Sequence, residues 1–250
     1  MSDLYWLTDA QMTRLEPCFP KSHGKPRVDH RRVPSGIILI NRNGLRWRDV
    51  PREYGPHKTL YNRRKRWSDK GVFAQMMAGL AAEHGEKQTV MIDATYLKAH
   101  RTASGLGAKN GGRGRLIGRI KGGMNARLDA IRDSKGRPID VFVPAGQVSD
   151  YISARALLSN LPDVDQLLGD RGYDADWFRD ALLDKGIRAC IPGRKQRRMP
   201  VRNDKRRYKR RNCIEIMFGR LKDRRRVATR YDRCPKVFCS AIALAALVIS

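Results

Sequence analysis

The chain has 250 residues, with 52 Lys and Arg against 25 Asp and Glu, and a formal net charge of +27 at pH 7. Such a charge attracts polyanions, so nucleic acid is the expected partner. It does not by itself distinguish an enzyme from a ribosome-like basic protein or from a solvated basic surface. The hydrophobic fraction of 41% is sufficient for a globular core in one or two domains.

Neither secretion nor membrane insertion is indicated. The first residues, MSDLYWLTDAQM, lack the basic start and apolar run of a signal peptide. The longest apolar stretch, Val237 to Ile249, is too short to span a bilayer and predicts a buried helix. Five cysteines without paired CxxC spacing indicate reduced thiols, and Cys234 and Cys239 have no nearby histidine for a zinc site. We therefore expect a cytoplasmic protein.

Residues 1–85 are predicted to form a small all-α domain that binds DNA. Helical patterns run from Thr8 to Phe19, from Asp29 to Gly44, from His57 to Lys70 and from Val72 to Ala82. A helix, a turn and a basic helix in succession are typical of a helix-turn-helix, whose second helix enters the major groove. The cations expected to contact DNA are Arg63, Arg64, Lys65 and Arg66. The alternative is that this helix face is merely solvated.

Residues 89–250 show strands alternating with helices. Strands are expected at Thr89–Thr95, around Ile139–Val143, at Gln166–Asp170 and at Ile187–Ile191, and helices at Ser149–Leu161, Asp174–Gly186 and Tyr208–Lys222. A further strand is expected before the turn at Asp133–Gly136. The order β-β-β-α-β-α-β-α predicts an α/β domain, in which a mixed sheet begins with an antiparallel meander and gains parallel strands.

Two basic segments within this domain are predicted to be loops. Residues 101–128 contain eight glycines and no acid, and residues 194–211 contain eleven Lys or Arg. Cations in such number cannot be buried without partners, so the segments must be solvated or paired with phosphate. We expect both to be mobile in the free protein and to become ordered along DNA, the alternative being permanently solvated linkers.

The spacing of four residues near the C-terminal end indicates a site for phosphate and metal. Tyr208, Arg211, Glu215 and Lys222 project within an arc of about 60° on a helix of roughly 100° per residue. The adjoining stripe is apolar, as expected for a helix packed on a core. A lone carboxylate beside this stripe, flanked by a tyrosine and two cations, is typical of such a site.

Two aspartates lie where they can join Glu215. The predicted order puts Asp93 on the first strand and Asp170 at the carboxyl end of the fourth, and ligands bind outside the carboxyl ends of strands in α/β sheets. Three carboxylates suit Mg²⁺ or Mn²⁺, and two such ions about 3.5–4 Å apart can clamp a phosphoryl displacement. Each acid also has a structural alternative: a strand-end acid, a turn residue, or an ion pair with Arg211.

These residues and their surroundings resemble bacterial DDE transposases of the IS4/IS5 type. The pattern Tyr208-x2-Arg211-x3-Glu215-x6-Lys222 matches the Y-R-E-K signature of that group. The sequence DRGY from Asp170 is similar to its second-Asp motif, and IDAT around Asp93 is similar to its first. The blocks GLRWRDVPREYGPHKTLYNR, KGGMNARLDAI and YKRRNCIEIMFGRLKD are also similar to IS5-family sequences, so the resemblance covers nearly the whole chain.

The resemblance implies an RNase H-like catalytic domain behind a helical DNA-binding domain. It implies that water activated by Mg²⁺ or Mn²⁺, with two ions per site, cleaves DNA at terminal inverted repeats, and that the freed 3′-OH then attacks target DNA. The implied metal ligands are Asp93, Asp170 and Glu215, with Arg211 and Lys222 holding phosphates and Tyr208 making a neighbouring contact.

The implied partners are the double-stranded DNA of the element ends and of the target. We expect a homo-oligomer on DNA, associated with the nucleoid, with no membrane partner, organic cofactor or ATP. The chain ends at Ser250 within an apolar helix, where the resemblance leads us to expect a polar tail.

Two other functions remain open on the sequence alone. A helix-turn-helix regulator with a catalytically inactive C-terminal half explains the charge and the N-terminal pattern, but leaves the spacing around Glu215 to chance. A stand-alone RNase H-fold nuclease would hydrolyse DNA without joining it. Metal-dependent cleavage separates the first from a transposase, and strand transfer by a pre-cut 3′-OH end separates the second.

Overall fold

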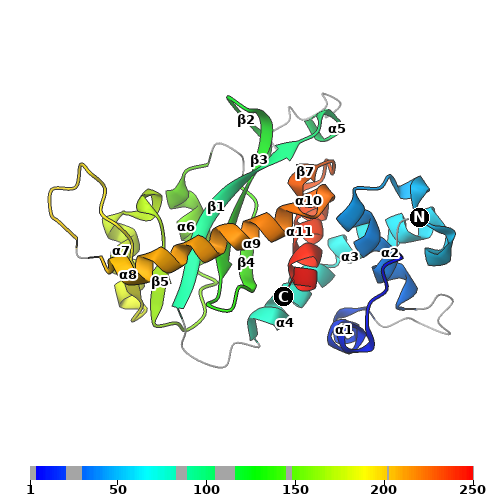
Figure 1. Cartoon of the computed structure of the whole chain (residues 1–250), viewed down its shortest axis with the longest axis horizontal. Helices are drawn as coiled ribbons and strands as arrows, with labels where there is room; N and C mark the ends of the chain where they lie inside the picture. Colours follow the sequence, from blue (N-terminus) through cyan, green and yellow to red (C-terminus); the bar gives the residue numbers. More distant parts are fainter. Residues whose placement is uncertain are drawn as a thin grey trace.

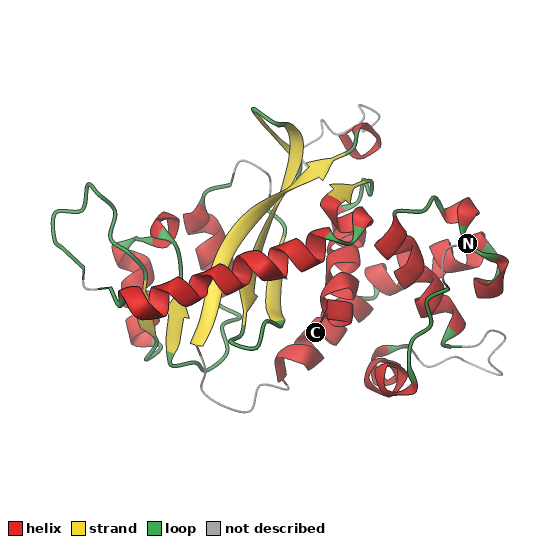
Figure 2. Ribbon diagram, viewed as in Figure 1, coloured by secondary structure: helices red, strands yellow, loops and turns green. Residues whose placement is uncertain are grey.

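One mixed sheet organises the chain from Thr89 onward, with helices on both of its faces (Figures 1 and 2). The computed structural model describes residues 4–20, 30–82, 89–104, 116–144, 148–201 and 203–249. The N-terminal helices lie at one end of the molecule, and the boundary expected at residues 86–88 lies outside the described ranges. Within those ranges, no helix is both long and apolar enough to cross a bilayer.

The sheet has the strand order of an RNase H-like fold. Its strands are β1 (Thr89–Ala99), β2 (Gly118–Ile120), β3 (Gly123–Arg132), β4 (Pro138–Phe142), β5 (Gln166–Leu168), β6 (Arg188–Cys190) and β7 (Thr229–Arg230). The long strand β3 pairs antiparallel with β1 and with β4, whereas β5 is parallel to β1 and β6 is parallel to β5. The order β4-β3-β1-β5-β6 therefore joins an antiparallel meander to two parallel strands, as predicted.

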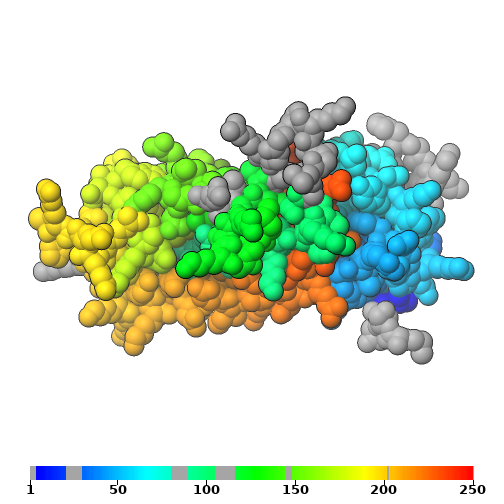
Figure 3. All heavy atoms as spheres, turned by 90° about the horizontal axis from the view of Figure 1, so that it is seen from above, coloured from blue at the N-terminus to red at the C-terminus, as the bar shows by residue number. Residues whose placement is uncertain are grey.

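Strand β1 separates two layers of the core, because alternate residues point to opposite faces. Val90 and Ile92 belong to the apolar cluster beneath α6 (Asp150–Leu158) and α7 (Asp176–Asp184). Met91 belongs to the other cluster, which α9 (Asn212–Lys222) covers. In the space-filling view, the orange segment that contains α9 runs along one side of the molecule toward the blue N-terminal helices (Figure 3).

The N-terminal helices form largely as predicted. They are α1 (Asp9–Leu15), η1 (Glu16–Cys18), α2 (Arg32–Asn43), η2 (Trp47–Asp49), η3 (Arg52–Tyr54), α3 (His57–Asp69) and α4 (Val72–Ala82). Thr8 and Gln11 make a capping box at α1, and Gly44 ends α2 with a left-handed φ of 68°. The expected cap Asp29 lies outside the described residues.

The same helices share a core with the C-terminal end of the chain. Helix α11 (Pro235–Ile249) packs on α2, α3 and α4, and α10 (Arg225–Ala228) packs on α2. The amide of Asn41 donates to the carbonyl of Ala241 over 2.8 Å. Buried apolar side chains of α2, α4 and α11 therefore join the N-terminal helices to the C-terminal end of the chain.

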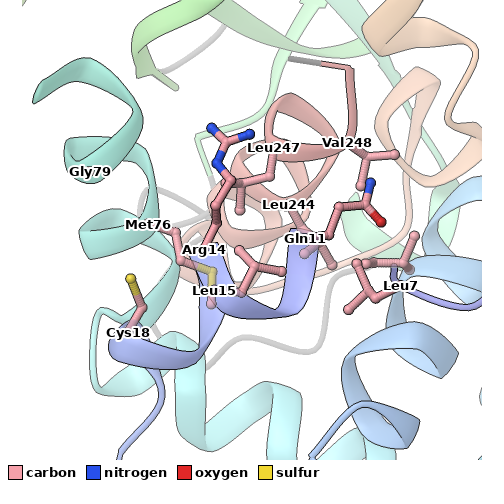
Figure 4. Close-up of a pocket in the computed structure, with 11 residues that line it drawn as sticks. Leu7, Gln11, Arg14, Leu15, Cys18, Met76, Gly79, Leu244, Leu247 and Val248 are labelled. Carbon is pink, nitrogen blue, oxygen red and sulfur yellow. The ribbon is translucent and has the colours of Figure 1, made fainter. Parts of the chain in front are cut away.

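A small cavity lies where α1, α4 and α11 meet (Figure 4). Its volume is about 110 Å³, and the side chains of Leu15, Met76 and Leu244 contribute to an apolar lining. Gln11 and Arg14 are the polar residues among those drawn around it.

A buried ion pair fixes α3 to the segment that precedes α11. The Arg64 guanidinium lies 2.7 Å and 3.1 Å from the two carboxylate oxygens of Asp232, and also donates to the carbonyl of Val237. The Arg64 side chain is 4% exposed. Burial raises the pKa of Asp232, but the guanidinium groups of Arg64, Arg226 and Arg230 lower it by more than burial raises it. The net shift of the pKa is therefore downward.

The first predicted basic loop, residues 101–128, is wrong over most of its described residues, whereas the second, residues 194–211, has no helix or strand in its described residues before Lys205. Residues 101–104 form α5, and residues 118–128 fall in β2, its turn and β3, whereas residues 105–115 lie outside the described ranges. In the second segment, Arg194 donates to the carbonyls of Arg171 and Gly172, and Arg197 pairs with Asp174. Local acids and carbonyls thus take up cations that we expected to be solvated.

Three predicted helices differ in detail. The helix expected from Tyr208 to Lys222 consists of α8 (Lys205–Tyr208), the 3₁₀ turn η6 (Lys209–Arg211) and α9. Helix α6 ends at Leu158 rather than Leu161. Asp174 does not cap α7, since the carboxylate accepts from the backbone amide of Arg194 and from the side chain of Arg179.

Removing the charge of Asp232 should destabilise the whole fold. In Asp232→Asn, Arg64 and Arg226 stay buried without a counter-charge, and breaking a buried pair costs about 3–5 kcal/mol. We expect a loss of this size in the free energy of unfolding, measured by urea denaturation of the full chain. Asp49→Asn is the matched control, because its pair with Arg46 is exposed and should be dispensable. Equal effects of the two substitutions would contradict this account.

Candidate active site

Asp93 and Asp170 lie side by side because of the parallel register of β1 and β5. Met91 pairs with Leu168, and the two aspartates each follow two residues later. Alternation along a strand returns them to the face of that pair, which is the face covered by α9. Asp170 continues β5 in an extended conformation (φ −80°, ψ 178°) and accepts a hydrogen bond of 2.8 Å from the Gly172 amide.

Helix α9 brings Glu215 to the same face. Its apolar stripe is buried and consists of Ile214, Met217, Phe218 and Leu221. Glu215 lies next to this stripe, and its side chain is 53% exposed. Asp93 is in contrast only 7% exposed, and its carboxylate accepts from the Ala94 amide over 2.8 Å.

The guanidinium of Arg211 lies between two of the three carboxylates. One terminal nitrogen donates to Asp93 Oδ2, and the same nitrogen is 3.7 Å from Glu215 Oε1. The negative charges of Asp93, Asp170 and Glu215 all raise the pKa of Arg211, and with Tyr208 they outweigh the lowering caused by burial. The Arg211 guanidinium therefore contacts Asp93, lies near Glu215, and is influenced by the charge of Asp170.

The electrostatics of Asp93 also bring the three acids together. Its pKa is raised to about 6, chiefly because burial disfavours the charged form. The Ala94 amide and the Arg211 guanidinium lower that pKa, whereas the charges of Asp170 and Glu215 raise it. An added positive charge near Asp93 would therefore stabilise the ionised form of its carboxyl.

Tyr208 and Lys222 flank this group at the two ends of the helical segment. The Arg211 guanidinium lies 5.9 Å from the centre of the half-buried Tyr208 ring, a cation–π distance. The ammonium of Lys222 donates to the Thr95 hydroxyl over 2.7 Å. All four residues of the sequence pattern therefore lie along the face of β1 that carries Asp93.

The donor set suits a hard divalent cation in its chemistry. Three carboxylates from separate elements are the oxygen ligands that Mg²⁺ and Mn²⁺ prefer, and added positive charge would relieve the repulsion at Asp93. Over the described ranges, however, no group of three His, Cys, Asp or Glu side chains is arranged to hold a metal ion. The positive charge next to Asp93 and Glu215 comes from the Arg211 guanidinium. A metal site shared by the three carboxylates stays a prediction.

The prediction for the α3 cations needs one correction. Lys65 and Arg66 are exposed, and Arg63 is half-buried with its guanidinium 5.7 Å from the ring centre of Trp67. Arg64 instead points into the protein and pairs with Asp232, so it is not available to DNA. The reason lies in the helical period, which puts Arg64 on the same face as Leu60 and Trp67.

Sequence reasoning missed two contacts that shape the site. Thr95 accepts from Lys222, and its position two residues after Asp93 on one strand was a usable signal. Arg132 of β3 donates to the carbonyl of Cys213 and so fixes the first turn of α9 to the sheet. No local pattern marks Arg132, because its partner is 81 residues away.

The raised pKa of Asp93 predicts a measurable pH dependence of stability. A carboxyl whose pKa is higher in the folded protein than in the unfolded chain stabilises the fold fully below the unfolded value of about 4, and this contribution is lost as the pH rises through 6. The stability of Asp93→Asn relative to wild type should therefore rise by about 2–3 kcal/mol between pH 4 and pH 7 and then stay level. Urea unfolding at each pH measures this.

The surface exchange Asp184→Asn on α7 provides the baseline for that series, because Asp184 is exposed. A difference between Asp93→Asn and wild type that is constant over this range would mean that Asp93 titrates normally. An NMR titration of the Asp93 carboxyl would then give an ordinary value instead of one near 6.

Two family models match this chain, one over the N-terminal helices and one over the C-terminal part. Residues 7–77 match a family described as putative transposase of IS4/5 family, and these residues include α1, α2 and α3. Residues 167–250 match the transposase DDE domain, which includes Asp170 and Glu215 and begins after Asp93.

Curated relatives are shorter than this chain. A putative transposase for insertion sequence element IS6501 of Brucella ovis is 33% identical over 128 residues, which are 50% of this chain and 98% of the relative. An uncharacterized protein of Sinorhizobium fredii is 34% identical over 110 residues, or 43% of this chain and 87% of that protein.

Two transposases are among the solved structures to which this chain is similar. A piggyBac transposase in a synaptic complex with hairpin DNA has a TM-score of 0.41 at 10% identity, covering 76% of this chain and 42% of that chain. The Mos1 transposase in a paired-end complex has a TM-score of 0.28 at 14% identity, covering 68% and 61%. This chain thus spans less than two thirds of either one.

The family assignment follows from these matches taken with the geometry. The chain covers nearly the whole length of a curated relative at 33% identity, and that relative is a putative insertion-sequence transposase. The two family matches agree with it and lie at the two ends of the chain. The chain therefore belongs to the IS4/5 family of putative transposases and carries a transposase DDE domain.

Proposed function

We propose that this protein cleaves DNA at the terminal inverted repeats of an insertion sequence and joins the resulting 3′-OH ends to target DNA. The observation that carries the proposal is the register that puts Asp93 and Asp170 on one face of the sheet, together with the Arg211 guanidinium that joins Asp93 to the neighbourhood of Glu215. The net charge of +27 and the family membership support DNA as the substrate.

Asp93, Asp170 and Glu215 would hold the metal, Mg²⁺ or Mn²⁺, with two ions per site. When bound, such ions generate a nucleophile from water or a 3′-OH and stabilise the leaving oxygen. The chain's own contribution begins with Asp93, which must be ionised to act as a ligand. With a pKa of about 6, its carboxyl is mostly ionised above pH 7.

The cations of the site would then hold phosphate. Arg211 presents a planar guanidinium that suits a phosphate, and it stays next to Glu215, whose carboxylate it orients. Lys222 is exposed and contacts the Thr95 hydroxyl, a neutral partner that DNA can displace. Tyr208 supports Arg211 through its ring and lies close enough to make a neighbouring contact with the DNA.

DNA would also be held outside the site by α3. Lys65 and Arg66 are exposed there, and Arg63 lies beside them, whereas Arg64 is excluded by its pair with Asp232. An element has two ends that are joined together, so a homo-oligomer would hold both at once. We place this activity in the cytoplasm, at the nucleoid, as we expected from the sequence.

Each of Asp93→Asn, Asp170→Asn and Glu215→Gln should lower the rate of cleavage at least about 100-fold in Mg²⁺. The amides keep the shape but remove charge that holds a cation, whose stabilisation is worth several kcal/mol. DNA affinity should change little, because these residues carry no positive charge. The assay is strand cleavage of a terminal-repeat duplex, with Asp184→Asn as the control. Wild-type cleavage by any one of the three variants would remove that residue from the site.

The same assay separates the two alternatives. A stand-alone nuclease would cleave the duplex but fail to join a pre-cut 3′-OH end to a second DNA. An inactive regulator would bind the duplex and never cleave it in Mg²⁺ or Mn²⁺. A transposase is expected to perform both steps with the wild-type chain.

Replacing Lys65 and Arg66 by Ala should flatten the dependence of DNA affinity on salt. Each phosphate contact contributes roughly 0.9 to the slope of log affinity against log salt, so losing two contacts should lower the slope by about 2. The measurement is a salt series of binding isotherms with the full chain. The matched control is Lys135→Ala with Lys185→Ala, which removes two exposed charges elsewhere. An equal slope change in both double variants would mean that α3 has no special role.

A further inference from the structure

A second cluster of charges lies on the opposite face of the sheet from α9. The Arg127 guanidinium of β3 contacts both carboxylate oxygens of Asp129, with Nη2 2.6 Å from Oδ1 and Nε 3.0 Å from Oδ2. It also donates to Asp150 at the start of α6, and to the carbonyl of Val148 over 2.9 Å. The side chains of Arg127 and Asp129 are 5% and 0% exposed. These residues, Arg127, Asp129 and Asp150, are named the β3 charge cluster below.

The β3 charge cluster reaches the turn that carries Asp170. The Tyr173 hydroxyl lies 3.5 Å from Asp129 Oδ1, and the Tyr173 ring is buried in the core beneath the sheet. Asp150 packs on Gly172 so closely that a Cβ added to Gly172 would lie 2.2 Å from Asp150 Oδ2. Gly172 is also the residue whose amide holds the Asp170 carboxylate. The cluster therefore contacts the turn at the two residues that follow Arg171.

Stability alone does not account for such a cluster. Burying ions is costly, and well-packed apolar residues of similar volume often stabilise a fold as well as or better than a buried ion pair. The guanidinium adds directed hydrogen bonds, because its fixed fork can hold β3, the start of α6 and Val148, two residues before that helix, in one geometry. Contacts with these fixed side chains restrict the movement of the 170–173 turn.

We propose that Arg127, Asp129 and Asp150 are positioning residues, which seat the 170–173 turn and thereby hold the Asp170 carboxylate beside Asp93. The inference rests on the proposed function for its consequence in catalysis, but its structural content concerns the turn itself. Arg127 and Asp129 act from the far side of the sheet and touch neither Asp93 nor α9. Residues that hold a metal ligand in place typically affect metal affinity or activity by about 10–100-fold.

The test compares the same conservative exchange at two arginines of β3 and its turn. Arg127→Lys keeps a positive charge but loses the fork that contacts Asp129 and Asp150. Arg137→Lys is the control, since Arg137 pairs with the buried Asp133 at the β3–β4 turn. Asp150→Ala is a second variant. Because the Asp150 side chain is 33% exposed, this variant is expected to fold even if Arg127→Lys does not.

Two readouts on the full chain are expected to change together. Hydrogen exchange of the Gly172 and Tyr173 amides should become at least about 10-fold faster in Arg127→Lys and in Asp150→Ala, with α9 unchanged. Cleavage of the terminal-repeat duplex should fall by about 10–100-fold in kcat, with DNA affinity within twofold of wild type. Arg137→Lys should match wild type in both readouts.

The outcomes distinguish this inference from the proposed function. One outcome refutes the positioning role. In it, the wild-type chain cleaves DNA, folded Arg127→Lys and Asp150→Ala cleave it equally well, and hydrogen exchange of the Gly172 and Tyr173 amides is unchanged. Equal losses in Arg137→Lys also refute it, because the effect would then be one of general stability. If the wild-type chain cleaves no DNA but exchange at the turn responds as expected, the seating of the turn stands and the proposed function falls.

Discussion

The burial of Asp93 beside the Arg211 guanidinium is the constraint on which the candidate site depends. Asp93 is buried in the middle of the sheet, where the loss of hydration and the charges of Asp170 and Glu215 raise its pKa to about 6. Like charges at close range in a poorly hydrated site repel strongly unless a cation compensates. Arg211 supplies that compensation, since its guanidinium contacts Asp93 and lies 3.7 Å from Glu215.

That arrangement also makes Arg211 a link between α9 and the sheet. Arg211 ends the 3₁₀ turn η6 directly before α9, and its guanidinium donates to Asp93 on β1, so it holds the start of α9 against that strand. One guanidinium offsets only part of the charge of three carboxylates, so further positive charge is favoured among them.

Much of the site could be predicted from the sequence because its signals are local. The two-residue period of β1, the acid two residues after β5 and the spacing from Tyr208 to Lys222 each depend on one element or one short helical segment. The burial of Arg64 could also be expected from its position four residues after Leu60 and three before Trp67. Its partner Asp232, 168 residues away, could not, because no periodicity links α3 to the segment before α11. The same holds for Arg132, whose acceptor lies on α9.

Long-range contacts of this kind also show that part of the net positive charge lies inside the protein. Several arginines are buried, and Arg230 is fully so, with its guanidinium donating to the carbonyl of Asp232 nearby and to that of Leu116, 114 residues away. A guanidinium stays ionised under any physiological condition and offers five donors in a fixed plane, so it can join carbonyls and acids from several elements at once. Part of the positive charge therefore serves as internal cross-links between segments far apart in the sequence. The cationic surface left for a polyanion is therefore smaller than the composition suggests, and exposed cations such as Lys65 and Arg66 on α3 belong to it.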